Sequence, residues 1–373
     1  MFPRQFGGSK NVSLLSQPHE VNPTKSKTMM AQKGITRKRR RTKKLSWDYY
    51  DQRGKLISNK KIIERCNKLV LPPAWKDVWI STDAKANLQA TGKDAKGRLQ
   101  YRYHEGWTKA RAAEKFDGMT RFARTLPSIR KKVAHDLKLE DMPKEKVVAL
   151  IVKLIDLYHF RVGNDEYAKQ NKSYGLTTLK EGHLKLDQSR SAEGEIDAVF
   201  EFVGKSGKLW KRRIWEDDLA ILISKSGAVG GRKKSQDLFR YEDKFGNDFD
   251  IKANHINEYL DAITADHEKV TAKDFRTWAA TWKAASRLSK QLDPDTVTAR
   301  KRVSNEVIKT VAFDLGNTPT VCRSSYIHPT ILSDWADGNF RSKWNKASRG
   351  RKLSGLSKEE TTTLMYLNLS KKH

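Results

Sequence analysis

Tyr326 is the residue with the clearest capacity for chemistry, and it lies in a short polar stretch near the C-terminal end, Gly316–Pro329. The same stretch contains Asn317, Arg323 and His328. A phenol with its usual pKa of about 10 is a poor nucleophile at neutral pH. It becomes useful where cationic donors favour the phenolate or the charge that it creates on its target. The stretch therefore predicts a tyrosine nucleophile that works on a phosphate together with arginine and lysine side chains.

The overall charge of the chain indicates what carries that phosphate. Among 373 residues, 74 Lys and Arg stand against 44 Asp and Glu, which gives a net charge of +30. Such an excess is typical of a protein whose partner is a polyanion, most often nucleic acid. The chain contains no apolar run near the length of about 20 residues that spans a bilayer, and no apolar secretory signal at its N-terminus. We therefore expect a nucleic-acid partner and no membrane.

The metal-ligating residue types are sparse. The chain has two cysteines, Cys66 and Cys322, and nine scattered histidines. So few cysteines indicate a reducing compartment rather than a disulfide framework. No Cys-x-x-Cys motif and no pair of histidines at helical spacing occurs, so the sequence predicts no metal site.

Composition divides the chain into three parts. Residues 1–45 are polar, lack periodic apolar positions and end in the basic run Arg37–Lys44, which predicts a disordered basic tail. This tail would contact phosphates or direct nuclear import, or it would be a solvated segment with no role. Residues 46–110 predict a small β-rich domain. Residues 111–373 predict a larger, mainly helical domain, so the fold class is α+β.

The β-rich part offers a pair of aromatic side chains. Strands are expected at Val78–Thr82 and Leu99–Tyr103, with one helix near Asn59–Lys68. Within the second strand, Tyr101 and Tyr103 share one sheet face, opposite Arg102. Two tyrosines beside arginines suit a groove or phosphate contact. Either tyrosine alone is more typical of a half-buried apolar face.

In the helical part, one buried helix is predicted at Lys146–Phe160, after a turn at Pro143. Arg161 follows it directly and precedes Gly163, so a rigid element would hold an outward-facing guanidinium. Taken alone, an arginine there is an ordinary charge that complements the helix dipole.

A lysine lies at the tip of a predicted hairpin. The alternating run Ala198–Val203 is followed by the tight turn Gly204–Lys208. The Gly-Lys-Ser of this turn does not make a phosphate-binding P-loop, because Val199 occupies the position of the first glycine. Lys205 at the tip is either a solvated charge or a mobile proton donor that reaches the site when DNA is bound. Residues 225–235 are expected to form a flexible basic loop.

A second arginine is predicted near the start of a helix. Thr271 and Asp274 fit a capping box, so Arg276 lies in the first turns, close to the helix end that favours phosphate. Lys273 shares its face. The alternative is a local ion pair with Asp274. Further helices are expected at Asn254–Ile263, Thr298–Asp314 and from Ser357 to Leu369.

Together these residues resemble one family, the type IB DNA topoisomerases of the bacterial and poxvirus kind. The matching segments occur in the family's order across residues 46–340. They are Leu71–Trp75, Gln100–Tyr103, Phe160–Asn164, Gly175–Leu179, Gly204–Gly207, Lys273–Trp278, Gly316–Pro319 and Ser325-Tyr326. The first 45 residues lie outside the resemblance.

The resemblance implies roles for five residues. The nucleophilic tyrosine falls on Tyr326, the two arginines on Arg161 and Arg276, and the hairpin lysine on Lys205. The fifth position falls on Asn317, where many relatives have histidine; an amide donates a hydrogen bond but cannot take up a proton. DNA-contact candidates implied by the same resemblance are Tyr101, Tyr103, Gly163, Tyr167, Thr178 and Lys273.

The implied activity is relaxation of supercoiled duplex DNA through a transient 3′-phosphotyrosyl break, without ATP or an essential metal. A monomer that clamps DNA is implied, located inside the cell: in the nucleoid or cytoplasm of a bacterium, or in the nucleus or virion of a eukaryotic or viral host. Two alternatives remain open. A tyrosine recombinase shares this catalytic plan but typically has His-x-x-Arg, whereas Lys273 stands three residues before Arg276 here. A non-catalytic DNA-binding protein would explain the charge alone.

Overall fold

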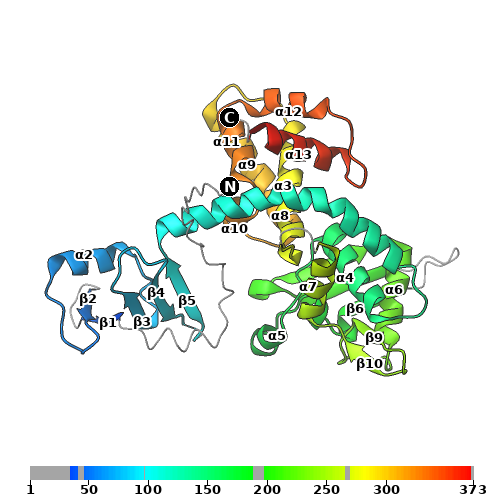
Figure 1. Ribbon diagram of the computed structural model, residues 1–373, viewed down its shortest axis with the longest axis horizontal. Helices are drawn as coiled ribbons and strands as arrows, with labels where there is room; N and C mark the ends of the chain where they lie inside the picture. Colours follow the sequence, from blue (N-terminus) through cyan, green and yellow to red (C-terminus); the bar gives the residue numbers. More distant parts are fainter. Residues whose placement is uncertain (1–33, 41–45, 96, 188–196, 265–268, 371–373) are drawn as a thin grey trace, which may run out of the picture. The chain divides into compact units, whose positions relative to one another are not determined.

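The computed structural model describes residues 34–40, 46–95, 97–187, 197–264 and 269–370. It divides within helix α3 (Glu105–Asp136) into two compact units, residues 1–113 and 114–373 (Figure 1). The first unit is rich in strands and the second is mostly helical, which confirms the predicted α+β class. Each unit has its own cluster of buried apolar side chains.

The first unit is built on one antiparallel sheet of five strands, in the order β2-β1-β3-β4-β5. Its elements are β1 (Gly34–Arg39), β2 (Trp47–Tyr50), α2 (Lys60–Lys68), β3 (Lys76–Ser81), β4 (Leu88–Lys93) and β5 (Leu99–Tyr103). Helix α2 begins where expected, because the Asn59 side chain accepts from the backbone N–H groups of Lys61 and Ile62. Ile35, Val78 and Ile80 contribute to the buried cluster.

Strand β1 corrects the predicted disordered tail, because it lies inside the basic run. Ile35 of this strand is buried and pairs with Ile80 of β3. The next inward-leaning residue, Arg37, donates to the carbonyl oxygens of Leu71 and Pro72 at 3.0 and 2.8 Å and stacks over the Trp47 ring. An arginine whose terminal NH₂ groups are bonded to backbone carbonyls can take the place of an apolar strand residue. A reading of charge alone misses this arrangement. Residues 1–33 and 41–45 lie outside the described part of the chain.

The second unit contains helices around a small three-stranded sheet, in the order β6-β7-β8. Its helices are α4 (Lys144–Tyr158), α5 (Asp165–Asn171), α6 (Asp217–Ala228), α7 (Ala253–Ile263), α8 (Ala272–Ser289), α9 (Val297–Leu315), α10 (Pro319–Ser325), α11 (Pro329–Ala336), α12 (Phe340–Ser348) and α13 (Lys358–Ser370). Its strands are β6 (Leu184–Asp187), β7 (Asp197–Val203), β8 (Leu209–Ile214), β9 (Arg240–Glu242) and β10 (Asp248–Asp250), with short 3-10 turns η1 (Leu176–Thr178), η2 (Glu181–His183) and η3 (Lys205–Gly207).

The predicted hairpin is confirmed as β7 and β8, which pair from Ala198↔Ile214 to Val203↔Leu209 with Lys205 at the tip. The predicted loop at residues 225–235 is wrong in its first part, since Lys225–Ala228 form the last turn of α6. Ser226 explains this: it is buried, and its hydroxyl exchanges hydrogen bonds with the backbone of Arg240. Tertiary contacts thus extend a helix that the small residues Ser226 and Gly227 do not favour by themselves.

A buried ion network joins the C-terminal helix to the rest of the second unit. Arg130 of α3 donates to Asp156 of α4 and, at 2.9 Å, to Glu360 of α13. Glu360 is 3% exposed and also accepts from the indole N–H of Trp278 on α8 at 3.2 Å. Removing one partner of such a network leaves an uncompensated buried charge, which is strongly destabilising. Helix α8, which carries Arg276, is therefore held partly by α13.

Candidate active site

Arg276 lies in the first turns of α8, as the capping box predicts. The Asp274 carboxylate accepts from the backbone N–H of Thr271 at 2.8 Å and from its hydroxyl at 2.7 Å, which fixes the start of the helix. Arg276 is only 3% exposed. Its guanidinium donates to the backbone carbonyl oxygens of His159 and Leu315, the latter at 2.8 Å. The backbone at the ends of α4 and α9 therefore orients this guanidinium.

Arg161 reaches the same place from the segment after α4. Its guanidinium donates to the side-chain oxygen of Asn317 at 2.5 Å, and Arg276 donates to that oxygen at 3.5 Å. Guanidinium groups only donate, so the amide oxygen of Asn317 must face them and its NH₂ group must point the other way. That NH₂ nitrogen is buried and has no hydrogen-bond partner among the described residues. Asn317 thus connects the two arginines, and its NH₂ group remains available to donate to a bound ligand.

Two glycines fix the backbone that carries Arg161. Gly163 has φ +120°, and a Cβ there would lie 2.9 Å from the Thr177 hydroxyl oxygen. A Cβ at Gly175 would lie 2.7 Å from the carbonyl oxygen of Arg161. The segments at Arg161 and Gly175 are also hydrogen bonded directly, since Leu176 donates its N–H to the Arg161 carbonyl oxygen at 2.9 Å. The close approach requires glycine on both sides.

Tyr326 follows α10, directly after its last residue. Thr281 of α8, one and a half turns beyond Arg276, anchors the backbone on both sides of it. Its hydroxyl donates to the carbonyl oxygen of Tyr326 at 3.2 Å and accepts from the N–H of His328 at 3.0 Å. The Arg276 guanidinium carbon lies 5.6 Å from the centre of the Tyr326 ring. The nucleophile and one arginine are therefore held by a single helix.

The charges around Tyr326 favour its phenolate. Burial would raise the pKa of the phenol, but the positive charges of Arg276 and Arg161, a hydrogen bond from Arg276 and the charge of Lys273 lower it below 10.0. Burial and repulsion by Arg161 lower the pKa of Arg276 to about 10, so it stays protonated at neutral pH. Neither arginine has a carboxylate partner among the described residues. Their charge is available to an anion.

Lys205 lies on the exposed hairpin tip and lines a pocket together with Arg161. Gly163, Asn164, Tyr167, Ser173, Tyr174 and Gly175 complete the lining of this pocket. The structure therefore brings Lys205 and Arg161 to one pocket. Asn317 accepts from both arginines, and Arg276 lies next to the Tyr326 ring, so the other four residues predicted for catalysis form one connected group.

The predicted DNA-contact residues differ in their positions. Lys273 is exposed in the first turn of α8, close enough to influence Tyr326. In the first unit, Tyr101 and Tyr103 stack on one face of β5 with ring centres 6.2 Å apart, as predicted. Thr178 is a correction: it is 3% exposed, and its hydroxyl is bonded to the backbone of Gly175. Its side chain supports the turn at the pocket and does not reach the surface.

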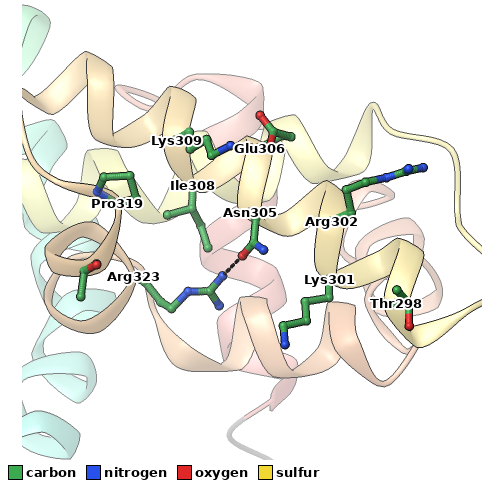
Figure 2. Close-up of a pocket in the computed structure, with 10 residues that line it drawn as sticks. Thr298, Lys301, Arg302, Asn305, Glu306, Ile308, Lys309, Pro319 and Arg323 are labelled. Carbon is green, nitrogen blue, oxygen red and sulfur yellow. Dashed lines mark hydrogen bonds and ion pairs between the residues drawn. The ribbon is translucent and has the colours of Figure 1, made fainter.

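A second concave surface lies between α9 and α10 (Figure 2). Four cationic side chains line it, namely Lys301, Arg302, Lys309 and Arg323. Arg323 donates across the groove to the side-chain oxygen of Asn305 at 2.5 Å (Figure 2). Glu306 compensates only Lys309, at 2.7 Å. The remaining three cations have no carboxylate partner among the described residues, so this basic groove carries uncompensated positive charge.

His159 is a functional residue that the sequence did not reveal. It ends α4 in the left-handed conformation, φ 59°, and its carbonyl oxygen accepts from Arg276. Burial, aided by the charges of Lys283 and Arg276, lowers the pKa of its imidazole to about 3. Both ring nitrogens are buried and have no partner in the described part of the chain. The only sequence signal is the break between a long apolar helix and Phe160.

The neutral His159 should make the fold sensitive to acid. Because its pKa is about 3 when folded and near 6.5 when unfolded, the unfolded chain binds the extra proton between these values. The contribution of His159 to the free energy of unfolding is therefore full above pH 6.5. It is lost as the pH falls from 6.5 towards 3, by about 1.4 kcal/mol per pH unit. His159→Asn keeps a residue that tolerates positive φ and removes this titration. Urea unfolding at pH 7 and pH 5 should show a smaller stability loss for the variant; equal losses would contradict the assignment.

Comparison with known proteins agrees with this fold and site. Residues 104–352 match the family model "Eukaryotic DNA topoisomerase I, catalytic core", and residues 46–94 match "Bacterial DNA topoisomerase IB, N-terminal domain". A DNA topoisomerase 1B of Acanthamoeba polyphaga mimivirus is 32% identical over 292 residues, which cover 76% of this chain and 82% of the relative. The DNA topoisomerase 1B of vaccinia virus (strain Copenhagen) is 23% identical over 268 residues, which cover 69% and 76% of the two chains.

The strand-rich first unit and the arginine–tyrosine cluster of the second thus belong to an enzyme that acts on DNA: the chain is a member of the DNA topoisomerase I family. Its N-terminal match and its viral relatives place it among the type IB DNA topoisomerases, which are isomerases.

No cluster of three or more metal-ligating side chains occurs in the described ranges. Among the helices that the structure describes, none is long and apolar enough to cross a bilayer.

Proposed function

We propose that the enzyme relaxes supercoiled duplex DNA by a reversible transesterification at Tyr326. The Tyr326 oxygen attacks a backbone phosphorus, a bond from that oxygen to phosphorus forms, and the bond from phosphorus to the 5′-oxygen breaks. The phenol gives up its proton to solvent, and the leaving 5′-oxygen gains one. The product is a 3′-phosphotyrosyl enzyme and a free 5′-hydroxyl, between which the broken strand rotates before the reverse step reseals it.

Arg161 and Arg276 stabilise the charge that develops on the non-bridging oxygens. A preorganised donor of this kind contributes most in a site shielded from water, and Arg276 is almost fully buried. The guanidinium groups are oriented by backbone carbonyls and by Asn317 rather than by carboxylates. They therefore meet the phosphate without first breaking an ion pair.

Lys205 acts as the general acid that protonates the leaving 5′-oxygen. Its place at the rim of the Arg161 pocket, on a short turn between two strands, supports this role. Asn317 donates its unpartnered NH₂ group to a non-bridging oxygen, so it hydrogen bonds but exchanges no proton. Since the covalent bond conserves the energy of the phosphodiester and the cations are all side chains, the reaction needs neither ATP nor a metal.

The observation that carries this proposal is the convergence of Arg161, Arg276 and Asn317 around the Tyr326 phenol, with the pKa of that phenol lowered. The test is relaxation of a supercoiled plasmid in a chelator and without ATP, with denaturant added during the reaction. We expect relaxed circles and a covalent protein–DNA adduct at a 3′-phosphate. A strict requirement for metal or ATP would contradict the proposal, and joined recombinant sites would favour the recombinase alternative.

We further propose that the basic groove binds DNA backbone phosphates. If Lys301 and Arg302 each hold one phosphate, the slope of log affinity against log salt should become shallower by about 0.9 for each residue changed to Ala. Titration of a linear duplex at several salt concentrations measures that slope. The matched control is Lys138→Ala, which removes one exposed positive charge after α3 and should leave the slope unchanged. Equal slopes for the groove variants and wild type would contradict this assignment.

A monomer acting inside the cell fits this activity, because one chain supplies all five catalytic groups and the two cysteines are free thiols. Sedimentation of the protein with and without duplex DNA tests the monomer.

A further inference from the structure

The hairpin that carries Lys205 is docked on the segment that carries Asn317. The Lys208 ammonium donates to the backbone carbonyl oxygen of Asn317 at 3.2 Å. Two residues on, the Trp210 ring fills the space between two glycines. A Cβ at Gly204 would lie 2.7 Å from this ring, and one at Gly316 would lie 2.0 Å from it. One side of β8 therefore contacts both the base of the hairpin tip and the residues next to the catalytic amide.

The tip itself is short and closed, so fixing one end of it fixes Lys205. Gly204 donates its N–H to the carbonyl oxygen of Lys208 at 2.8 Å, and Gly207 donates to the carbonyl oxygen of Gly204 at 3.1 Å. Lys205 lies within this hydrogen-bonded turn, and its side chain is exposed. Its side chain makes no hydrogen bond or ion pair with any described residue, so its placement depends on the turn beneath it. The Lys208 bond is the polar link from that turn to the segment of Asn317.

We propose that Lys208 is a positioning residue for the general acid: its bond to the Asn317 carbonyl holds the hairpin tip so that Lys205 faces the leaving 5′-oxygen. The inference rests on the proposed role of Lys205. Lys208 donates no proton to the substrate; it fixes the distance between the proton donor and the group formed by Asn317, Arg161 and Arg276. Orientation of this kind matters because a misplacement of about 1 Å lowers a rate by about 100-fold.

The plain alternative is that Lys208 is a solvated lysine whose bond has no effect, since an exposed hydrogen bond contributes little to stability. Lys211 separates the two interpretations. It is an exposed lysine on β8, three residues after Lys208, and it makes no bond to the Asn317 segment. Lys211→Met removes the same charge and the same ammonium as Lys208→Met, without touching the tip.

The experiment compares two duplex substrates that differ in one atom. In the first, the scissile bond joins phosphorus to the 5′-oxygen; in the second, sulfur replaces that oxygen. A thiolate leaves without being protonated, because thiols are far more acidic than alcohols, so cleavage of the sulfur substrate needs no general acid. Single-turnover cleavage is measured for wild type and for Lys208→Met, Lys208→Arg, Lys211→Met, Lys205→Met and the double variant Lys205→Met/Lys208→Met.

We expect Lys208→Met to cleave the oxygen substrate about 10- to 100-fold more slowly and the sulfur substrate at nearly the wild-type rate. Lys208→Arg, which keeps a donor of similar reach, should recover most of the rate, and Lys211→Met should cleave both substrates normally. The double variant should be no slower than Lys205→Met alone, because Lys208 acts only through Lys205.

Equal slowing of both substrates by Lys208→Met, or no slowing, would overturn the inference, and so would additive losses in the double variant. The Lys205→Met arm tests the proposed function separately. If sulfur fails to rescue that variant, Lys205 is not the general acid, and the role proposed for it in the reaction is wrong. If sulfur rescues Lys205→Met but Lys208→Met behaves like wild type, only the positioning role of Lys208 is lost.

Discussion

Tyr326→Phe should abolish plasmid relaxation, with a rate loss on the order of 10⁴-fold or more, because no other group can form the covalent bond to phosphorus. The substitution removes one oxygen atom and keeps the ring, which packs against the core of the second unit. The Arg276 guanidinium, 5.6 Å from the ring centre, keeps its backbone partners. The positive charge that meets the DNA is therefore unchanged, and duplex affinity should stay within a few-fold of wild type.

Three measurements on the Tyr326→Phe protein check this. Plasmid relaxation should be absent, denaturant should trap no covalent adduct, and duplex titration should give nearly the wild-type affinity. Ser333→Ala on α11 is the matched control, because it also removes one hydroxyl group. Ser333 is exposed and lies outside the cluster and the basic groove, so this variant should relax plasmid normally. Residual relaxation with a trapped adduct in Tyr326→Phe would place the nucleophile on another residue.

Arg276→Gln should give the second-largest loss, at least about 10²- to 10³-fold in single-turnover cleavage, as expected when a preorganised donor to a developing oxyanion is removed. The amide of Gln can still donate to a buried backbone carbonyl, such as that of Leu315, so the change removes the charge with little cost in unpaired groups. Since Arg276 contributes the largest favourable charge at Tyr326, the pKa of the phenol should rise. The ascending limb of the cleavage rate against pH should move to higher pH.

The control for Arg276→Gln is Arg287→Gln on the same helix. Arg287 is paired with Asp314 at 2.6 Å and takes no part in the cluster, so its loss should leave the cleavage rate close to wild type. Thermal unfolding of both variants separates a folding defect from a catalytic one. If Arg276→Gln cleaves at the wild-type rate with an unshifted pH profile, Arg276 does not stabilise the transition state.

The sequence was informative where local rules decide the structure. The capping box at Thr271 and Asp274 predicts the position of Arg276, and the Gly204–Lys208 turn predicts the hairpin. The five catalytic candidates came from the resemblance of their motifs to one family. The structure brings these residues together although more than 150 positions separate Arg161 from Tyr326 in the chain. Their individual residue types would not have selected them.

What the sequence missed depends on tertiary contacts. Arg37 belongs to a strand because three backbone carbonyls accept its donors, and no periodicity signals that arrangement. The carbonyl oxygens of His159 and Leu315 orient Arg276, but backbone atoms leave no residue type to recognise. The family resemblance implied Thr178 as a contact residue, yet its hydroxyl closes a buried turn. In each case a distant partner, not the local pattern, determines the role.

The ion network at Glu360 has a consequence for how far the functional protein extends. The match to the catalytic core ends at residue 352, whereas Glu360 lies beyond it on α13. A chain cut at residue 352 would remove Glu360 and leave the Arg130 guanidinium and the Trp278 indole N–H without this hydrogen-bond acceptor. Trp278 is two residues from Arg276. The smallest active fragment must therefore include Glu360 and the start of α13, because a residue beyond the matched core contacts the helix that carries Arg276.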